Sequence, residues 1–176
     1  MIFVKLALSL SSAWSNKAIK EMKNSTQKNI KGLSIAILII ATVYLAFLYG
    51  TTINQLWIQK SVVWNPDNLV WQYFIIAGRL VGAALLYAFC VIFLVRTNRS
   101  LKNGVIFPKS NIALIRWTAL VSVLVTFVHA NYEDVLQGGT NSVLDGNTIF
   151  VPLVVLFFAG LYKMAYLTAK DSHLAI

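Results

Sequence analysis

The chain has 176 residues, of which 58% are hydrophobic and only 12% are charged, whereas soluble domains average about 45–50% and about 25%. This composition excludes an ordinary soluble enzyme, whose surface needs more charge, and a disordered chain, which would be poor in apolar residues. The net charge is +9, but the basic residues lie between long apolar runs, where they set membrane orientation and do not indicate nucleic-acid binding.

The apolar runs predict four membrane-spanning helices, because about 20 apolar residues cross roughly 30 Å of hydrocarbon. A strand in lipid would require a closed barrel, and these runs lack the alternation of barrel strands. We therefore expect an all-α membrane protein with a four-helix transmembrane bundle in residues 33–169. The expected spans cover about residues 33–53, 69–95, 111–132 and 148–169.

Residues 1–32 form a basic segment ahead of the first span. At 100° per residue, one face of this segment is apolar and largely opposite its lysines, which favours an amphipathic helix lying on the membrane surface. A solvated basic tail is the alternative. The residues on the apolar face are Phe3, Ala7, Leu10 and Trp14.

The first two spans are joined by an aromatic-rich connection. Trp57, Trp64, Trp71 and Tyr73 cluster around it, as in the aromatic belts found at membrane–water interfaces.

Arg79 is the one charged residue deep within a predicted span, about 15 Å from the outer end of the second helix. A charge at that depth costs about 2.5–3.5 kcal/mol on insertion scales and should face the protein interior. Candidate partners at the outer end of the third span are Glu133, Asp134 and His129. Arg79 then either links two helices through a carboxylate or lines a site for an anionic ligand.

Small residues near Arg79 predict close helix packing. Gly78 and Gly82 form a GxxxG step, which lets two helix backbones approach each other in lipid, within one bundle or between subunits of a homo-oligomer. Gly160 offers a similar notch in the fourth span.

The third and fourth spans carry basic residues near their inner ends. Arg116 and Lys163 are expected to extend their charged groups toward the lipid phosphates. Ser110 or Asn111 is a candidate cap of the third helix, and Pro152 is expected in the first turn of the fourth.

The sequence lacks motifs for catalysis or cofactors. Its single cysteine, Cys90, excludes an internal disulfide, and there is no zinc spacing, phosphate-binding loop or nucleophile motif. Asp134 and Asp145 in the third connection could bind a cation together, although a solvated acidic turn is the simpler interpretation. We therefore expect no catalytic residue, metal or cofactor.

The distribution of Lys and Arg predicts the orientation. Basic residues are concentrated before the first span and between the second and third spans, whereas the other two connections carry only Lys60. By the positive-inside rule, both termini, the middle connection and the tail 170–176 face the cytoplasm in a multi-pass membrane protein.

The second half of the chain resembles a bacterial four-span membrane family catalogued as domain of unknown function 2975. The matching features are a basic stretch ending the second span, the segment with Gly104, Phe107 and Asn111, an arginine early in the third span (Arg116), and a short polar and apolar tail. In this chain the tail lacks the usual run of glutamates, and Ala175 stands where the family has a threonine.

The resemblance implies a membrane partner of a small helix-turn-helix transcription regulator, since family members are often encoded beside one. We therefore expect a non-catalytic regulatory or accessory protein that contacts a cytoplasmic protein and does not bind nucleic acid directly. The alternative is a small transporter or channel subunit in which Arg79 lines an anionic-ligand path.

Overall fold

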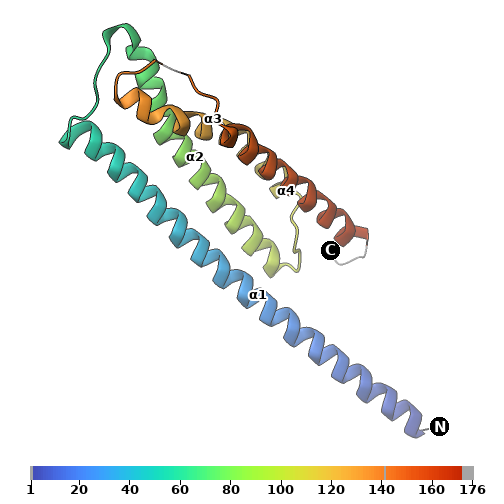
Figure 1. Cartoon of the computed structure of the whole chain (residues 1–176). Coiled ribbons are helices and arrows are strands. Elements are labelled where there is room, and N and C mark those ends of the chain that lie inside the picture. Colours follow the sequence, from blue (N-terminus) through green and yellow to red (C-terminus); the bar gives the residue numbers. More distant parts are fainter. Residues whose placement is uncertain (1, 141, 172–176) are drawn as a thin grey trace. The chain divides into compact units, whose positions relative to one another are not determined.

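The protein is helical along the part of the chain that the structure describes. This computed structural model describes the backbone of residues 2–140 and 142–171 and the side chains of residues 24–140 and 142–171. Short connections separate four long helices, and no strand occurs within those residues (Figure 1). The elements in chain order are α1 (Ile2–Ile53), a π-helical turn η1 (Asn54–Ile58), a 3-10 turn η2 (Pro66–Asn68), α2 (Leu69–Lys102), α3 (Ser110–Leu136) and α4 (Gly146–Asp171).

All four helices are long and apolar enough to cross a membrane. The prediction of an all-α protein with four membrane-length helices is therefore confirmed. The helices extend beyond the expected spans because their polar ends stay helical: α2, for example, continues through Arg96 and Arg99 to Lys102. Basic side chains in a last turn interact favourably with the negative end of the helix dipole, which supports this extension.

The start of α4 differs from the prediction. The helix begins at Gly146, so Pro152 lies in its second turn and not in its first. The first turn is closed by the Thr148 N–H, which donates to Asp145 O (2.9 Å). Because proline has no N–H, the carbonyl of Thr148 cannot receive the usual bond from position 152.

Contacts divide the chain into two compact units, residues 1–37 and 38–176. The first unit is the amino-terminal part of α1, and its backbone is helical from Ile2 onward. The predicted apolar face of residues 3–14 lies outside the described side chains, and the tail from residue 172 lies outside the described residues.

In the second unit, the carboxyl-terminal half of α1 runs antiparallel to α2. The Tyr49 hydroxyl donates to Leu80 O (2.8 Å), and Thr42 Oγ1 lies 3.0 Å from the Tyr87 hydroxyl. The residue numbers of these pairs run in opposite directions along the two helices, so α1 and α2 form a helical hairpin. Interhelical hydrogen bonds of this kind help to hold helices together in lipid, where burial of apolar surface gives no driving force.

Helix α3 is central to the second unit, because it packs against both α2 and α4 (Figure 1). Its face toward α2 carries Val128, Tyr132 and Val135, which recur at the spacing of one helix face and are fully buried. They belong to one cluster with Ile75 and Ile76 of α2.

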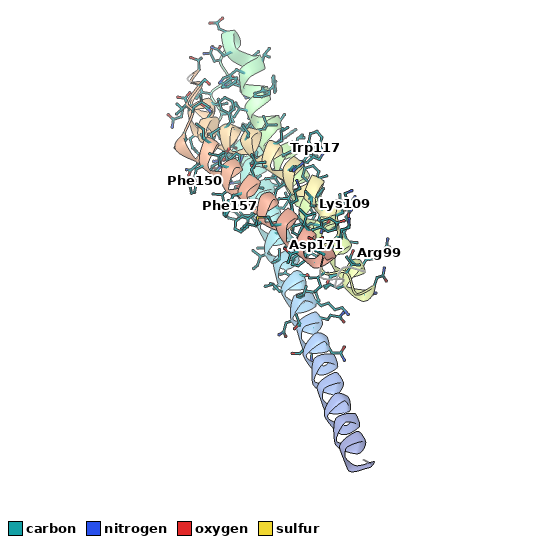
Figure 2. The ribbon with its side chains drawn as sticks, turned by 90° about the vertical axis from the view of Figure 1, so that its right-hand side faces the viewer. Arg99, Lys109, Trp117, Phe150, Phe157 and Asp171 are labelled. Carbon is teal, nitrogen blue, oxygen red and sulfur yellow. The ribbon has the colours of Figure 1, made fainter. Side chains whose placement is uncertain are left out.

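The two ends of this unit differ in charge. The carboxyl end of α2 and the amino end of α3 form what we call the basic end, whose exposed cations are Arg96, Arg99, Lys102 and Lys109. Figure 2 shows Arg99, Lys109 and Asp171 toward this end. The opposite end consists of η1, η2 and the connection 137–145, and its only basic residue in the connections is Lys60.

The GxxxG step of α2 faces α3. A Cβ atom added to Gly82 would lie 2.5 Å from Cγ2 of Val125, and one added to Gly78 would lie 3.0 Å from Cγ2 of Val128. These glycines therefore serve packing within the chain. The expectation for Gly160 is wrong for contacts within this chain: the residue is exposed on the outward side of α4, and an added Cβ would meet nothing within 4 Å.

The outer surface of α4 is strongly apolar. Phe150 and Phe157 project from this helix (Figure 2) and are 65% and 64% exposed. A soluble protein rarely exposes so large an apolar surface, whereas lipid is a suitable solvent for it.

Replacing Gly82 with leucine should destabilise the detergent-solubilised protein by about 1–3 kcal/mol, the usual cost of overpacking. The neighbouring Val125 is β-branched and cannot easily rotate out of the way. The measurement is thermal unfolding followed by the helical circular dichroism signal. Gly160→Leu is the matched control and should leave the midpoint close to that of the parent chain. Equal losses in both variants would contradict the packing role of Gly82.

Candidate functional site

A buried side-chain amide fixes the connection between η1 and η2. Gln72 of α2 is fully buried, and its Nε2 donates to Val63 O (2.8 Å) and Val135 O (3.1 Å). Its Oε1 accepts from the Asn65 N–H (3.0 Å). One amide therefore joins this connection to α2 and to the end of α3, with its donors and its acceptor all used.

A second amide fixes the connection between α3 and α4. The Asn131 side chain pairs with the backbone of Val143 in both directions: Nδ2 donates to Val143 O (3.0 Å) and Oδ1 accepts from Val143 N (2.6 Å). Nδ2 also donates to Phe127 O in its own helix (2.8 Å). This pairing imitates a backbone ladder and holds the connection against α3.

The cation Arg79 lies beside Tyr132. The guanidinium carbon is 3.7 Å from the centre of the Tyr132 ring, a cation–π contact worth about 2 kcal/mol when desolvated. The Tyr132 hydroxyl donates to Gln55 Oε1 (2.8 Å), and Gln55 belongs to the π-helical turn η1. The Nε atom of Arg79 is buried without a hydrogen-bond partner. The aromatic face, and not a carboxylate, accommodates this charge.

The predicted partners of Arg79 are therefore wrong. Glu133 and His129 are exposed, and Glu133, which directly follows Tyr132, points about 100° away from it around α3. The Asp134 carboxylate faces its own turn, where it would collide with a Cβ atom added to Gly139. Arg79 consequently contacts an aromatic residue that precedes the two carboxylates in sequence.

The acidic connection does not form a metal site in the described residues. Asp145 is exposed, and its Oδ2 accepts from Asn147 Nδ2 (2.8 Å) at the start of α4. Among the side chains of residues 24–140 and 142–171, His, Cys, Asp and Glu do not gather in groups of three or more that could hold a metal ion.

A third buried amide organises the basic end. Asn111 is fully buried, and its Nδ2 donates to Thr97 Oγ1 of α2 (2.9 Å) and to the Tyr162 hydroxyl of α4 (3.3 Å). This residue links α2, α3 and α4. The expected capping of α3 by Ser110 or Asn111 does not occur; instead the Asn111 N–H donates to Pro108 O (3.0 Å), which leaves the side chain free for the interhelical bonds.

The connection 103–109 is packed against α4. The Phe107 ring meets the Tyr162 ring edge to face, with centroids 5.5 Å apart. Gly104 has a φ of 79°, a left-handed conformation that favours glycine, and it turns the chain after α2. Arg96 Nη1 donates to Ser110 O (3.3 Å) and ties α2 to the start of α3.

Of the residues that carried the family resemblance, Phe107 and Asn111 both contact Tyr162. Arg116 lies apart from this cluster with an exposed side chain, as does Lys163 on α4. Tyr162 was missed by the sequence reasoning, because a tyrosine near a helix end resembles any interfacial aromatic residue. Comparison with family models, curated proteins and solved structures finds no match for this chain.

Replacing Gln72 with leucine should destabilise the protein by about 1–3 kcal/mol for each buried polar group left unpaired. The groups left unpaired are the Asn65 N–H and the Val63 carbonyl, whereas Val135 O keeps its bond from the Gly138 N–H (3.1 Å). Gln137→Leu is the matched control, because Gln137 is exposed. Thermal unfolding in detergent measures the difference. If both substitutions have the same effect, Gln72 does not hold this connection.

Proposed function

We propose that this chain is a multi-pass protein of a bacterial cytoplasmic membrane that acts as a non-catalytic regulatory or accessory partner of a cytoplasmic protein. The observation that carries the proposal is the anchoring of the basic end, formed by the carboxyl end of α2, the connection 103–109 and the amino end of α3, to α4. Its cations are exposed, while Phe107 and Asn111 hold it to Tyr162 of α4. A preorganised cationic surface loses little conformational entropy when a partner binds.

The anchoring suggests how a partner would influence the membrane helices. Arg99 and Lys102 are exposed at the end of α2, where an acidic surface of a cytoplasmic protein could reach them. A partner that displaced the end of α2 or the connection 103–109 would disturb the hydrogen bond between Asn111 and Tyr162, and with it the contact between α3 and α4. A small helix-turn-helix regulator is the partner that the family resemblance suggests.

The hydroxyl groups within the spans support this function over transport. Ser122 and Thr126 donate to carbonyls of their own helix, at Ala119 O (2.7 Å) and Ser122 O (2.7 Å). Thr42 donates to Leu38 O (2.8 Å) in the same way. Groups bonded within their own helices are poorly suited to line a polar path, for which several such groups would have to face one channel.

The proposed orientation can be tested with single cysteines in a chain in which Cys90 is replaced by alanine. A cysteine at Ser142 should react with a membrane-impermeant thiol reagent in intact cells, whereas one at Ser100 should react only after the membrane is opened. The reason is that the connection rich in Lys and Arg stays inside. The reverse labelling pattern would contradict the orientation.

The partner can be sought by photo-crosslinking in the native membrane. A photoreactive amino acid at Lys102 should give a defined adduct with a cytoplasmic protein, and the same group at Ser142 should not. Arg99→Gln should reduce the adduct several-fold by removing a neighbouring cation, with Lys60→Gln as the matched control at the opposite end. Mass spectrometry then identifies the partner, and a DNA-binding regulator is expected.

Adducts between two copies of the chain alone would contradict the partner function and favour the oligomeric transporter. Glutamine is used in these variants in preference to glutamate, because a charge reversal next to a span could itself invert the orientation.

A further inference from the structure

An apolar groove runs between α2 and α4 in the half of the unit next to the basic end. Its volume is about 660 Å³, within the range of about 300–1,000 Å³ that is typical of small-molecule sites. Helix α3 forms the floor, and the walls come from the two outer helices. Representative lining residues are Phe89 and Phe93 of α2, Leu114 and Thr118 of α3, and Phe158 and Leu161 of α4.

The surroundings of the groove require an apolar occupant. Because the groove lies within the membrane-length part of the helices, its open side faces hydrocarbon, and an unfilled void there would lose dispersion contacts on every wall. A lipid acyl chain has the shape and polarity to fill it.

The end of the groove nearest the connection 103–109 changes from apolar to polar. Phe107 and Tyr162 line it there, and the Tyr162 hydroxyl bonds to Asn111. Arg96 follows Phe93 by three positions and so lies on the same side of α2, about one turn further toward the basic end. It reaches across to Ser110 O, the first residue of α3.

The charge at that end fits an anionic headgroup. Arg96 and Lys109 are both exposed, and Lys109 lies at the amino end of α3 (Figure 2), where the helix dipole is positive. Asp171 at the end of α4 is the acidic residue shown toward this end (Figure 2), and it is outnumbered by the cations. Cations at the ends of membrane-spanning helices lie at the depth of the lipid headgroups, where they can bind lipid phosphates.

We propose that this groove is a binding site for an anionic phospholipid, with one acyl chain between α2 and α4 and the phosphate at Arg96 and Lys109. The acyl chain of the lipid is held by apolar contacts alone, and these contacts are the same whatever headgroup the lipid carries. The two cations supply the preference for an anionic lipid over a zwitterionic one. The site is independent of the proposed protein partner, which would contact Arg99 and Lys102.

The test is native mass spectrometry of the full chain in detergent, titrated with phosphatidylglycerol or phosphatidylcholine of identical acyl chains. The parent chain should bind one phosphatidylglycerol more tightly than phosphatidylcholine. The double variant Arg96→Gln/Lys109→Gln should lose roughly thirty-fold of that preference, since each charge near a membrane surface contributes about 1 kcal/mol and 1.4 kcal/mol is tenfold. Arg99→Gln/Lys102→Gln is the matched control and should keep the preference.

A second variant separates the acyl chain from the headgroup. Ala165 lines the groove, so Ala165→Trp should fill part of it and weaken both lipids equally without changing their ratio. Gly160→Trp is the control, because Gly160 faces open space on the same helix. Unchanged circular dichroism and a single chromatographic peak establish that each variant is folded, and Ala165→Leu, a smaller change, serves if the tryptophan variant is not.

Three results would overturn the proposal. The first is equal binding of the two lipids by the parent chain. The second is an equal loss of preference in the two double variants, which would show that the preference depends on the net charge of the protein and not on Arg96 and Lys109. The third is a dimer of the chain that forms without bound lipid and disappears in Ala165→Trp, because the groove would then be a contact between two copies.

Discussion

A polar group that is buried in a membrane protein has no water to bond with, and this constraint shapes the connections of the chain. Three carboxamide side chains supply the missing partners: Gln72, Asn111 and Asn131. Each lies on a helix and reaches the backbone of a connection or the side chains of neighbouring helices. An amide is well suited to this task, because it both donates and accepts and carries no charge that would have to be desolvated. These amides fasten α2, α3 and α4 near their ends, and hydrogen bonds such as that from Tyr49 to Leu80 O link α1 to α2 within the spans.

Hydropathy was sufficient to predict the helices, because a run of apolar residues in lipid has almost no alternative to helix. It was not sufficient to predict which faces meet. Helix α2 is apolar around most of its circumference, so periodicity does not distinguish the side that contacts α3 from the side exposed to lipid. The small residues Gly78 and Gly82 mark the face of α2 that contacts α3, since close packing at a small residue depends on its size and not on hydropathy. Gly160 shows the limit of that signal, because the same residue type is exposed on α4.

The environment of Arg79 could not be predicted from the sequence for a specific physical reason. Opposite charge pointed to Glu133 and Asp134, and position at the outer end of the third span added His129. The aromatic face of Tyr132 satisfies a guanidinium without an anion, at lower desolvation cost than a buried ion pair. Tyr132, Gln72 and Asn131 are ordinary residues of interfacial segments when taken one at a time. Their roles depend on contacts between positions as far apart as Gln55 and Tyr132, which no local pattern encodes.

The π-helical turn at the end of α1 has a consequence for how this protein can change over time. In η1 the Gln59 N–H bonds to Asn54 O, five residues back, which is the geometry an α-helix adopts when it absorbs one extra residue. Deleting one residue there would convert the wide turn into an ordinary α-helical turn and leave the register on both sides nearly unchanged. Tyr49 and Thr42 would keep their partners on α2. Single-residue deletions should accordingly be tolerated better in this turn than in the middle of α1, where each would rotate one part of the helix by about 100° relative to the other.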